Sequence, residues 1–191
     1  MLSSFPHGSR ALVTGASRGI GLEFVRQLLA ASGFDRVYAA CRQPAFATQL
    51  AALASHEPRL RLVALDVADE AQVEAAAREV AADTDRLHLV VNAAGVLHES
   101  ATGMAPEKRL ADVRTDTLAA SFAVNAFGPL LVAKHFERLL AHRERAVFAT
   151  VSARVGSIGD NRLGGWYAYR GAQAAQNMFT KTLSVEWARS R

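Results

Sequence analysis

The feature of the sequence that most constrains its fold is a glycine pattern between a short apolar run and a helical segment. The apolar run covers residues 11–14, and residues 15–21 then read Gly-Ala-Ser-Arg-Gly-Ile-Gly. Gly15 permits a tight turn, Gly19 allows the backbone to approach a ligand, and Gly21 allows a helix to pack closely on the strand. The first N–H groups of that helix are then free to bind phosphate. The pattern predicts a nucleotide-binding strand, turn and helix, against the alternative of a glycine-rich turn without a ligand.

Short apolar runs alternate with helical patterns along the whole chain. We expect strands over residues 11–14, 36–40, 60–65, 87–92 and 146–152. Three helices between them are expected to bury one apolar stripe each, formed by Ile20, Phe24 and Leu28, by Phe46, Leu50 and Leu53, and by Val73, Ala77 and Val80. Most of the strands lack a polar face, as strands covered on both sides should. The alternation predicts an α/β fold of three layers, with a doubly wound parallel sheet of the Rossmann type and about five strands.

Three details of the helices follow from the same reading. Asp69 and Gln72 are expected to cap the start of the third helix. A longer helix is expected over residues 117–140, bent near Gly128-Pro129, because proline disrupts a helix interior. Another is expected over residues 168–188, with Ala175, Phe179, Leu183 and Trp187 along one side.

Length and composition narrow the class of protein. The chain has 191 residues, of which 50% are hydrophobic, so a single domain over residues 1–191 is expected. Cys41 is the only cysteine, which excludes an internal disulfide framework and fits a reducing compartment. Because the first ten residues also lack a signal-peptide pattern, we expect a cytoplasmic protein.

Charge and apolar patterning argue against several kinds of partner. The net charge is +4, but the basic residues are scattered among glutamates without interleaved aromatic residues, so we expect no nucleic-acid partner. The longest apolar stretch, residues 118–133, is interrupted by Asn125 and Gly128-Pro129, and no membrane segment is expected. The six histidines are dispersed and are interpreted as ordinary surface residues, so no metal site is expected.

Four motifs together resemble the short-chain dehydrogenase/reductase family. They are the turn Thr-Gly-x-x-x-Gly-x-Gly at residues 14–21, Asp66-Val67, Asn92-Ala93-Ala94-Gly95, and the segment 124–129 around Asn125, in the family's order. Residues 164–170, Gly-Gly-Trp-Tyr-Ala-Tyr-Arg, are especially similar to the C-factor-like and sniffer-like carbonyl reductases of that family. The resemblance implies a dinucleotide cofactor and an oxidoreductase activity on a small carbonyl compound or alcohol. It also implies a cofactor site formed by Gly15, Ser17, Arg18, Gly19, Ile20, Gly21, Arg42, Asp66, Val67, Asn92, Ala93, Gly95 and Gln173.

The choice between NAD and NADP depends on the end of the second predicted strand. In NAD-specific sites an acidic residue there binds the ribose 2′-hydroxyl. Residues 40–43 read Ala-Cys-Arg-Gln, without a carboxylate. Arg42 and Arg18 are suited to pair with a 2′-phosphate, although each could instead be a solvated side chain. NADP(H) is therefore expected in preference to NAD(H).

The family's catalytic positions are only partly kept. The resemblance implies a catalytic tyrosine at Tyr169, with a lysine four residues later and a serine at the end of the fifth strand, and a structural and catalytic asparagine at Asn125. Residues four apart share one helix face, but the lysine position holds Gln173, which carries no charge to stabilise a tyrosinate. The serine position holds Ala153, while Ser152 is expected to face the other side of the strand. We therefore expect weakened chemistry that favours reduction.

The sequence leaves three interpretations open. A doubly wound dinucleotide domain has six strands, and five are predicted here, so the family's next strand is expected to be missing and the fifth strand to expose an apolar edge. The first interpretation is an impaired NADPH-dependent carbonyl reductase. The second is a non-catalytic nucleotide-binding or regulatory relative, and the third is a truncated product without function. The resemblance also implies a homo-oligomer built by the helices around residues 117–140 and 168–188.

Overall fold

A computed structural model describes residues 2–100 and 102–189, which form two compact units. The first unit comprises residues 2–94 and 131–151, and the second comprises residues 95–130 and 152–189. The single domain expected over residues 1–191 remains a prediction, and its residues 1, 101, 190 and 191 lie outside the described part.

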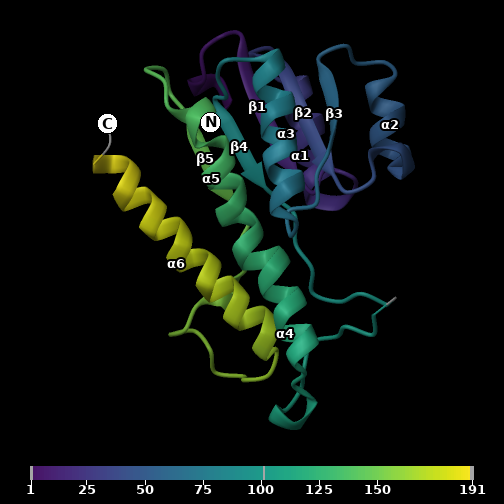
Figure 1. Cartoon of the computed structure of the whole chain (residues 1–191), viewed down its shortest axis with the longest axis vertical. Coiled ribbons are helices and arrows are strands. Elements are labelled where there is room, and N and C mark those ends of the chain that lie inside the picture. The colour runs from purple at the N-terminus through teal and green to yellow at the C-terminus, as the bar shows by residue number, and fades with distance from the viewer. Residues whose placement is uncertain (1, 101, 190–191) are drawn as a thin grey trace. The chain divides into compact units, whose positions relative to one another are not determined.

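The first unit is built on a parallel five-stranded sheet in the order β3-β2-β1-β4-β5 (Figure 1). The strands are β1 (Ser9–Thr14), β2 (Phe34–Cys41), β3 (Leu60–Ala64), β4 (Leu89–Asn92) and β5 (Val147–Thr150). Because consecutive strands are parallel, each connection must cross over the sheet, mostly through a helix. Almost every side chain of β1, β2 and β4 is buried, as the continuous apolar runs predicted. The α/β Rossmann-type fold predicted from the sequence is confirmed.

Three complete helices and part of a fourth belong to this unit. They are α1 (Gly19–Ala30), α2 (Thr48–Ala54), α3 (Glu70–Asp83) and the last ten residues of α5 (Gly128–Leu140). The Asp69 half of the predicted capping pair of α3 is confirmed, because its side chain accepts hydrogen bonds from the backbone N–H groups of Ala71 and Gln72. The Gln72 Oε1 atom instead accepts from the Asp66 N–H group at 3.2 Å. Figure 1 shows α3 in front of the sheet, and Glu70 at its start forms an ion pair with Lys134 of α5 at 2.6 Å.

Two predicted helix stripes are partly wrong. Ile20 of α1 is 61% exposed, and the buried stripe of this helix consists of Leu22, Val25, Leu28 and Leu29. Ile20 still belongs to the glycine turn, where the helix has only begun. Phe46 is also exposed, because it lies in a short 3-10 helix (Pro44–Phe46) ahead of α2. The stripe of α3 is confirmed, with Val73, Ala77 and Val80 all buried.

The second unit consists mainly of helices. It contains α4 (Thr115–Phe122), a π-helical segment η4 (Ala123–Phe127), the first three residues of α5, and α6 (Tyr167–Arg189). Short 3-10 helices cover Leu110–Asp112 and Arg154–Gly156. Within the unit, α6 packs against α4, η4 and the 3-10 helix at Arg154–Gly156. The stripe of Ala175, Phe179, Leu183 and Trp187 is half-buried.

The helical stretch from Thr115 to Leu140 is continuous, as the long helix predicted over residues 117–140 requires. Asn125 and Gly128-Pro129 do not interrupt it, since the π-helical turn of η4 precedes Pro129 and α5 follows directly. The resulting helix is long and apolar enough to cross a membrane by length and composition alone. Its Val132 and Phe136, however, are fully buried side chains of the first unit, and a core helix passes the same test.

Candidate functional site

The glycine turn between β1 and α1 leaves no room for side chains on its inner side. Gly15 has a φ of +67°, and a Cβ atom there would lie 2.6 Å from the Cα atom of Ala94. A Cβ atom on Gly21 would lie only 2.3 Å from the carbonyl oxygen of Gly15. Gly19 has a φ of +58°, but a Cβ atom on this residue would have no other atom within 4 Å. The turn is therefore packed on one side and open at Gly19, where α1 begins.

The N-terminus of α1 is free to accept an anion. Arg18 occupies the N-cap position, with extended backbone, and its side chain makes no capping hydrogen bond. The first N–H groups of a helix need an acceptor and carry a partial positive charge, which phosphate satisfies. The geometry of the turn thus fits the pyrophosphate of a dinucleotide.

Two buried polar atoms lie at the carboxyl ends of neighbouring strands. Thr14 ends β1 and is paired with Asn92, which ends β4. The Thr14 hydroxyl and the Asn92 Oδ1 atom are both buried without a hydrogen-bond partner among the described residues. A buried polar group without a partner costs about 1–3 kcal/mol, so such atoms mark a place where a ligand or water completes the bonding. Ala93 and Ala94 continue directly from Asn92 beside Gly15.

The end of β2 presents a cation and no carboxylate. Arg42 is exposed, as is Arg18, and neither guanidinium makes a hydrogen bond or ion pair with a described residue. Burial raises the pKa of the neighbouring Cys41 thiol, which disfavours a reactive thiolate. At the end of β3, Asp66 is half-buried and its Oδ1 atom accepts from the Ala68 N–H group at 3.0 Å, while Val67 is buried.

The second unit contains the predicted catalytic positions. Tyr169 and Gln173 lie four residues apart in the first two turns of α6, and Gln173 is 3% exposed. The Ser152 hydroxyl lies 2.7 Å from Asn177 Oδ1 and 3.3 Å from Gln173 Oε1. The expectation that Ser152 faces away on the fifth strand was wrong, because β5 ends at Thr150 and Ser152 belongs to the following loop. Ala153 follows it as the N-cap of the 3-10 helix at Arg154–Gly156.

Asn125 holds the loop that follows β4. Its Nδ2 atom donates to the Val96 carbonyl oxygen at 2.7 Å, and its Oδ1 atom accepts from the Val96 N–H group at 2.8 Å. Nδ2 also lies 3.1 Å from Ser121 Oγ, and the side chain is fully buried. Gly95 is beside this amide, since a Cβ atom there would lie 3.2 Å from Asn125 Oδ1. The side chain of Asn125 therefore has a structural role, within a π-helical turn of the kind often found at functional sites.

Comparison with known proteins agrees with this arrangement. Residues 9–191 match the model of the short chain dehydrogenase family. The chain belongs to that family. An uncharacterized oxidoreductase of Schizosaccharomyces pombe is 33% identical over 92% of this chain and 66% of its own length.

Two solved structures are also similar. The NADPH-bound carbonyl reductase from chicken fatty liver has a TM-score of 0.85 at 32% identity, covering 96% of this chain and 72% of the other. The carbonyl reductase Sniffer of D. melanogaster has a TM-score of 0.86 at 27% identity, covering 97% and 77%.

The resemblance to sniffer-like carbonyl reductases seen in the sequence is thus confirmed for this short-chain dehydrogenase family member. The chain spans about two thirds of the length of the curated relatives it matches. Within the described residues β5 is an edge strand of the sheet. The residues that bind cofactor and act in catalysis, as assigned by the family pattern, remain predictions.

The sequence did not predict the contacts of two residues near the predicted catalytic positions, Ser152 and Glu107. Ser152 was set aside, although it contacts Gln173 at the family's lysine position. Glu107 received no attention, although it is buried and accepts a hydrogen bond from the first turn of α6. An acidic residue in an otherwise exposed loop gives no sequence signal of burial, because its partner lies 61 residues away.

One histidine cluster differs from the expectation of ordinary surface histidines. His88 is 2% exposed, and its ligand atoms lie within 4.8 Å of those of His142 and Glu144, close enough to hold a metal ion. His88 Nδ1, however, accepts a hydrogen bond from the Arg10 N–H group at 3.1 Å, so the ring proton sits on Nε2, which faces Glu144 at 2.7 Å. A metal-ligating histidine normally donates through its other nitrogen. The hydrogen bonding therefore favours a structural network, in which the hydrogen bond from His88 lowers the pKa of Glu144.

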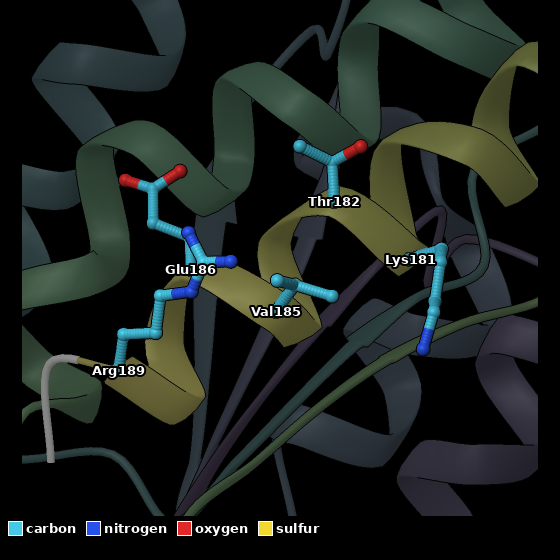
Figure 2. A pocket seen from close by; sticks show the side chains of 5 residues that line it. All are labelled: Lys181, Thr182, Val185, Glu186 and Arg189. Carbon is cyan, nitrogen blue, oxygen red and sulfur yellow. The ribbon is translucent and has the colours of Figure 1, made fainter.

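A hollow of about 490 Å³ on α6 is separate from these positions. Figure 2 shows the five side chains that line it, Lys181, Thr182, Val185, Glu186 and Arg189, all from the later turns of this helix. None of them is among the predicted cofactor or catalytic residues. The hollow has no assigned role in the chemistry.

Proposed function

We propose that this short-chain dehydrogenase is an NADP(H)-dependent reductase of small carbonyl compounds with weakened chemistry. The observation that carries the proposal is the glycine turn, packed at Gly15 and Gly21 and open at Gly19, with an uncapped helix N-terminus behind it. The guanidinium groups of Arg18 and Arg42, exposed and unpaired within the described residues, favour a 2′-phosphate, since no carboxylate ends β2. The structurally similar carbonyl reductase from chicken fatty liver is an NADPH-bound protein.

Each residue has a defined part in the proposed reaction. NADPH, when bound, would supply the hydride that reduces a carbonyl group. Tyr169 would donate its phenolic proton to the carbonyl oxygen, so that an alcohol forms. Gln173 would hydrogen-bond the nicotinamide ribose, and the Ser152 hydroxyl, 3.3 Å from Gln173 Oε1, would hold its amide in place. Ala153 offers no hydroxyl to polarise the carbonyl group, and the loss of one such donor costs about a hundred- to a thousandfold in rate.

We expect the wild-type chain to reduce aldehydes faster than it oxidises the corresponding alcohols at pH 7. Reduction starts from a neutral phenol, the ordinary form of a tyrosine at that pH, whereas oxidation requires a tyrosinate that Gln173 has no charge to stabilise. Initial rates in both directions, with a panel of aldehydes and alcohols and both cofactor forms saturating, test this expectation. Comparable or faster oxidation would contradict it.

Replacement of Arg42 by alanine is expected to weaken NADPH binding about tenfold or more while NADH binding changes little. The reason is the loss of one charge-assisted contact to the 2′-phosphate, worth about 1.5–3 kcal/mol. Dissociation constants from cofactor fluorescence measure both effects. Arg26→Ala, an exposed arginine of α1 beyond the glycine turn, is the matched control. An equal loss of affinity for NADPH and NADH in Arg42→Ala would show that the residue does not bind the 2′-phosphate.

A non-catalytic nucleotide-binding role is the second candidate, and Ala153 with Gln173 favours it. Tight NADPH binding without turnover of any carbonyl compound would support this second role.

A cytoplasmic location and a homo-oligomer, with no nucleic-acid or membrane partner, belong to the proposal of an NADP(H)-dependent reductase.

A further inference from the structure

The start of α6 is held by a buried carboxylate from a distant loop. Glu107 is 4% exposed, and its Oε2 atom accepts a hydrogen bond from the Ala168 N–H group at 3.3 Å. Its backbone carbonyl oxygen accepts from the Trp166 N–H group at 2.6 Å. Its second carboxylate oxygen, Oε1, is buried without a partner in the described part of the chain. A carboxylate is stabilising at a helix N-terminus, where N–H groups lack partners. Glu107 therefore caps the helix that carries Tyr169.

The backbone before this helix is strained. Gly164 and Gly165 both have a φ of +65°, and Trp166 follows with a φ of +54°. Trp166 is the one non-glycine residue with positive φ among residues 2–100 and 102–189. Such a conformation costs about 1–3 kcal/mol and persists only where the surroundings impose it. The main chain at Glu107 packs directly against this turn, because a Cβ atom on Gly165 would lie 3.0 Å from the Glu107 carbonyl oxygen.

The strained turn contacts the catalytic position directly. The Trp166 ring meets the Tyr169 ring edge-on, with 6.3 Å between their centroids. Arg170, the next residue, donates from Nε to the Gly165 carbonyl oxygen at 3.1 Å and from Nη1 to the Val155 carbonyl oxygen at 3.4 Å. Val155 lies two residues after Ala153. The turn at residues 164–166 thus links the ring of Tyr169 to the segment that follows the family's serine position.

We propose that Glu107 is a positioning residue for Tyr169. It holds residues 164–166 in the left-handed conformation, and through Trp166 it fixes the ring from which the proton is donated. Glu107 acts through the turn. The inference rests on the proposed role of Tyr169 in carbonyl reduction, but the conformation of the turn can be measured without turnover.

The first test compares Glu107→Ala with Glu107→Gln in a Trp187→Phe background. The chain has two tryptophans, so Trp166 is then the only one and its fluorescence reports on the turn. In Glu107→Ala the emission should move to longer wavelength and acrylamide quenching should increase. The rate constant for aldehyde reduction should fall about 10- to 100-fold, because misplaced catalytic groups cost this much, while the dissociation constant for NADPH stays within about twofold. Glu107→Gln keeps an acceptor for the Ala168 N–H group and should behave like the parent. Glu79→Ala, an exposed carboxylate of α3, is the control.

The second test changes the turn and leaves the carboxylate intact. Gly165→Ala and Gly164→Ala introduce the same methyl group at the same φ, but only the former brings it against the backbone carbonyl oxygens of Glu107 and Lys108. A Cβ atom on Gly164 would have no atom of the described residues within 4 Å. Gly165→Ala should reproduce the Glu107→Ala emission change, and Gly164→Ala should show less than half of it. If Glu107→Ala does not fold, this pair still shows whether the main chain at Glu107 restrains the turn.

Three results would overturn the inference. They are unchanged Trp166 emission in Glu107→Ala, a Gln variant as impaired as the Ala variant, and equal effects of the two glycine substitutions. If the wild-type chain reduces no carbonyl compound, the proposed function fails, while the emission and quenching measurements still decide whether Glu107 holds the turn.

Discussion

Gly21→Ala is expected to raise the dissociation constant for NADPH at least about a hundredfold and to lower the free energy of unfolding. Helix propensity alone predicts the opposite for stability, because alanine in a helix interior is favoured over glycine by about 1 kcal/mol. Here the added methyl group would lie 2.3 Å from the carbonyl oxygen of Gly15 and 2.7 Å from its carbonyl carbon. Both atoms are backbone, so they can move only if the turn itself moves. Overpacking of this kind costs about 1–3 kcal/mol.

The two effects of Gly21→Ala are separable. Chemical denaturation gives the free energy of unfolding, and a cofactor titration under native conditions gives the dissociation constant. Gly33→Ala is the matched control, because that glycine belongs to the same unit and has no positive φ. A Cβ atom on Gly33 would come no closer than 3.9 Å to a described atom, the Pro6 carbonyl oxygen. NADPH binding within about threefold of wild type in Gly21→Ala would show that the tight packing of the turn is not needed for the cofactor.

The double variant Ala153→Ser/Gln173→Lys is expected to raise kcat/KM for aldehyde reduction about a hundredfold. A serine hydroxyl at position 153 restores one polarising donor, worth about a hundred- to a thousandfold. A lysine at position 173 would have Ser152 Oγ and Asn177 Oδ1 nearby as acceptors, given their contacts with each other and with Gln173. Burial of the ammonium group opposes part of this gain, since Gln173 is 3% exposed.

The two restored residues should act together. Each single substitution should raise kcat/KM by less than half of the double variant's gain on a logarithmic scale, because catalytic groups that act as a unit are non-additive. Alcohol oxidation should rise more than reduction, since the lysine charge stabilises the tyrosinate that oxidation requires. Met178→Lys and Ala120→Ser introduce a lysine and a serine at exposed positions of α6 and α4 and should leave the rates unchanged. A double variant that binds NADPH but gains no turnover would contradict the assigned catalytic positions.

The sequence predicted the elements that depend on local pattern. The five strands were expected within two residues of most of their observed ends, because buried parallel strands are continuous apolar runs. The Asp69 cap and the stripe of α3 followed from neighbouring residues in the same way. The start of α1 was less predictable, since Ile20 fits the helical spacing but lies in the turn, where its side chain is exposed.

The parts that were missed depend on contacts between distant residues. The helix over residues 117–140 was expected, but not its π-helical turn at Ala123–Phe127, within which the Asn125 side chain bonds to Val96, 29 residues away. The positions of Ser152 and Glu107 are also set by partners 21 and 61 residues away. No periodicity or local motif reports such pairings, whereas the glycine turn is encoded within eight consecutive residues, 14–21.

The proposed cofactor preference is tested most directly by titrating the wild-type chain with NADPH and NADH, followed by cofactor fluorescence, on protein that unfolds cooperatively. We predict saturable binding of NADPH, at least about tenfold tighter than that of NADH because Arg18 and Arg42 can pair with the 2′-phosphate. A folded chain that binds neither cofactor, or that binds NADH more tightly, would contradict it.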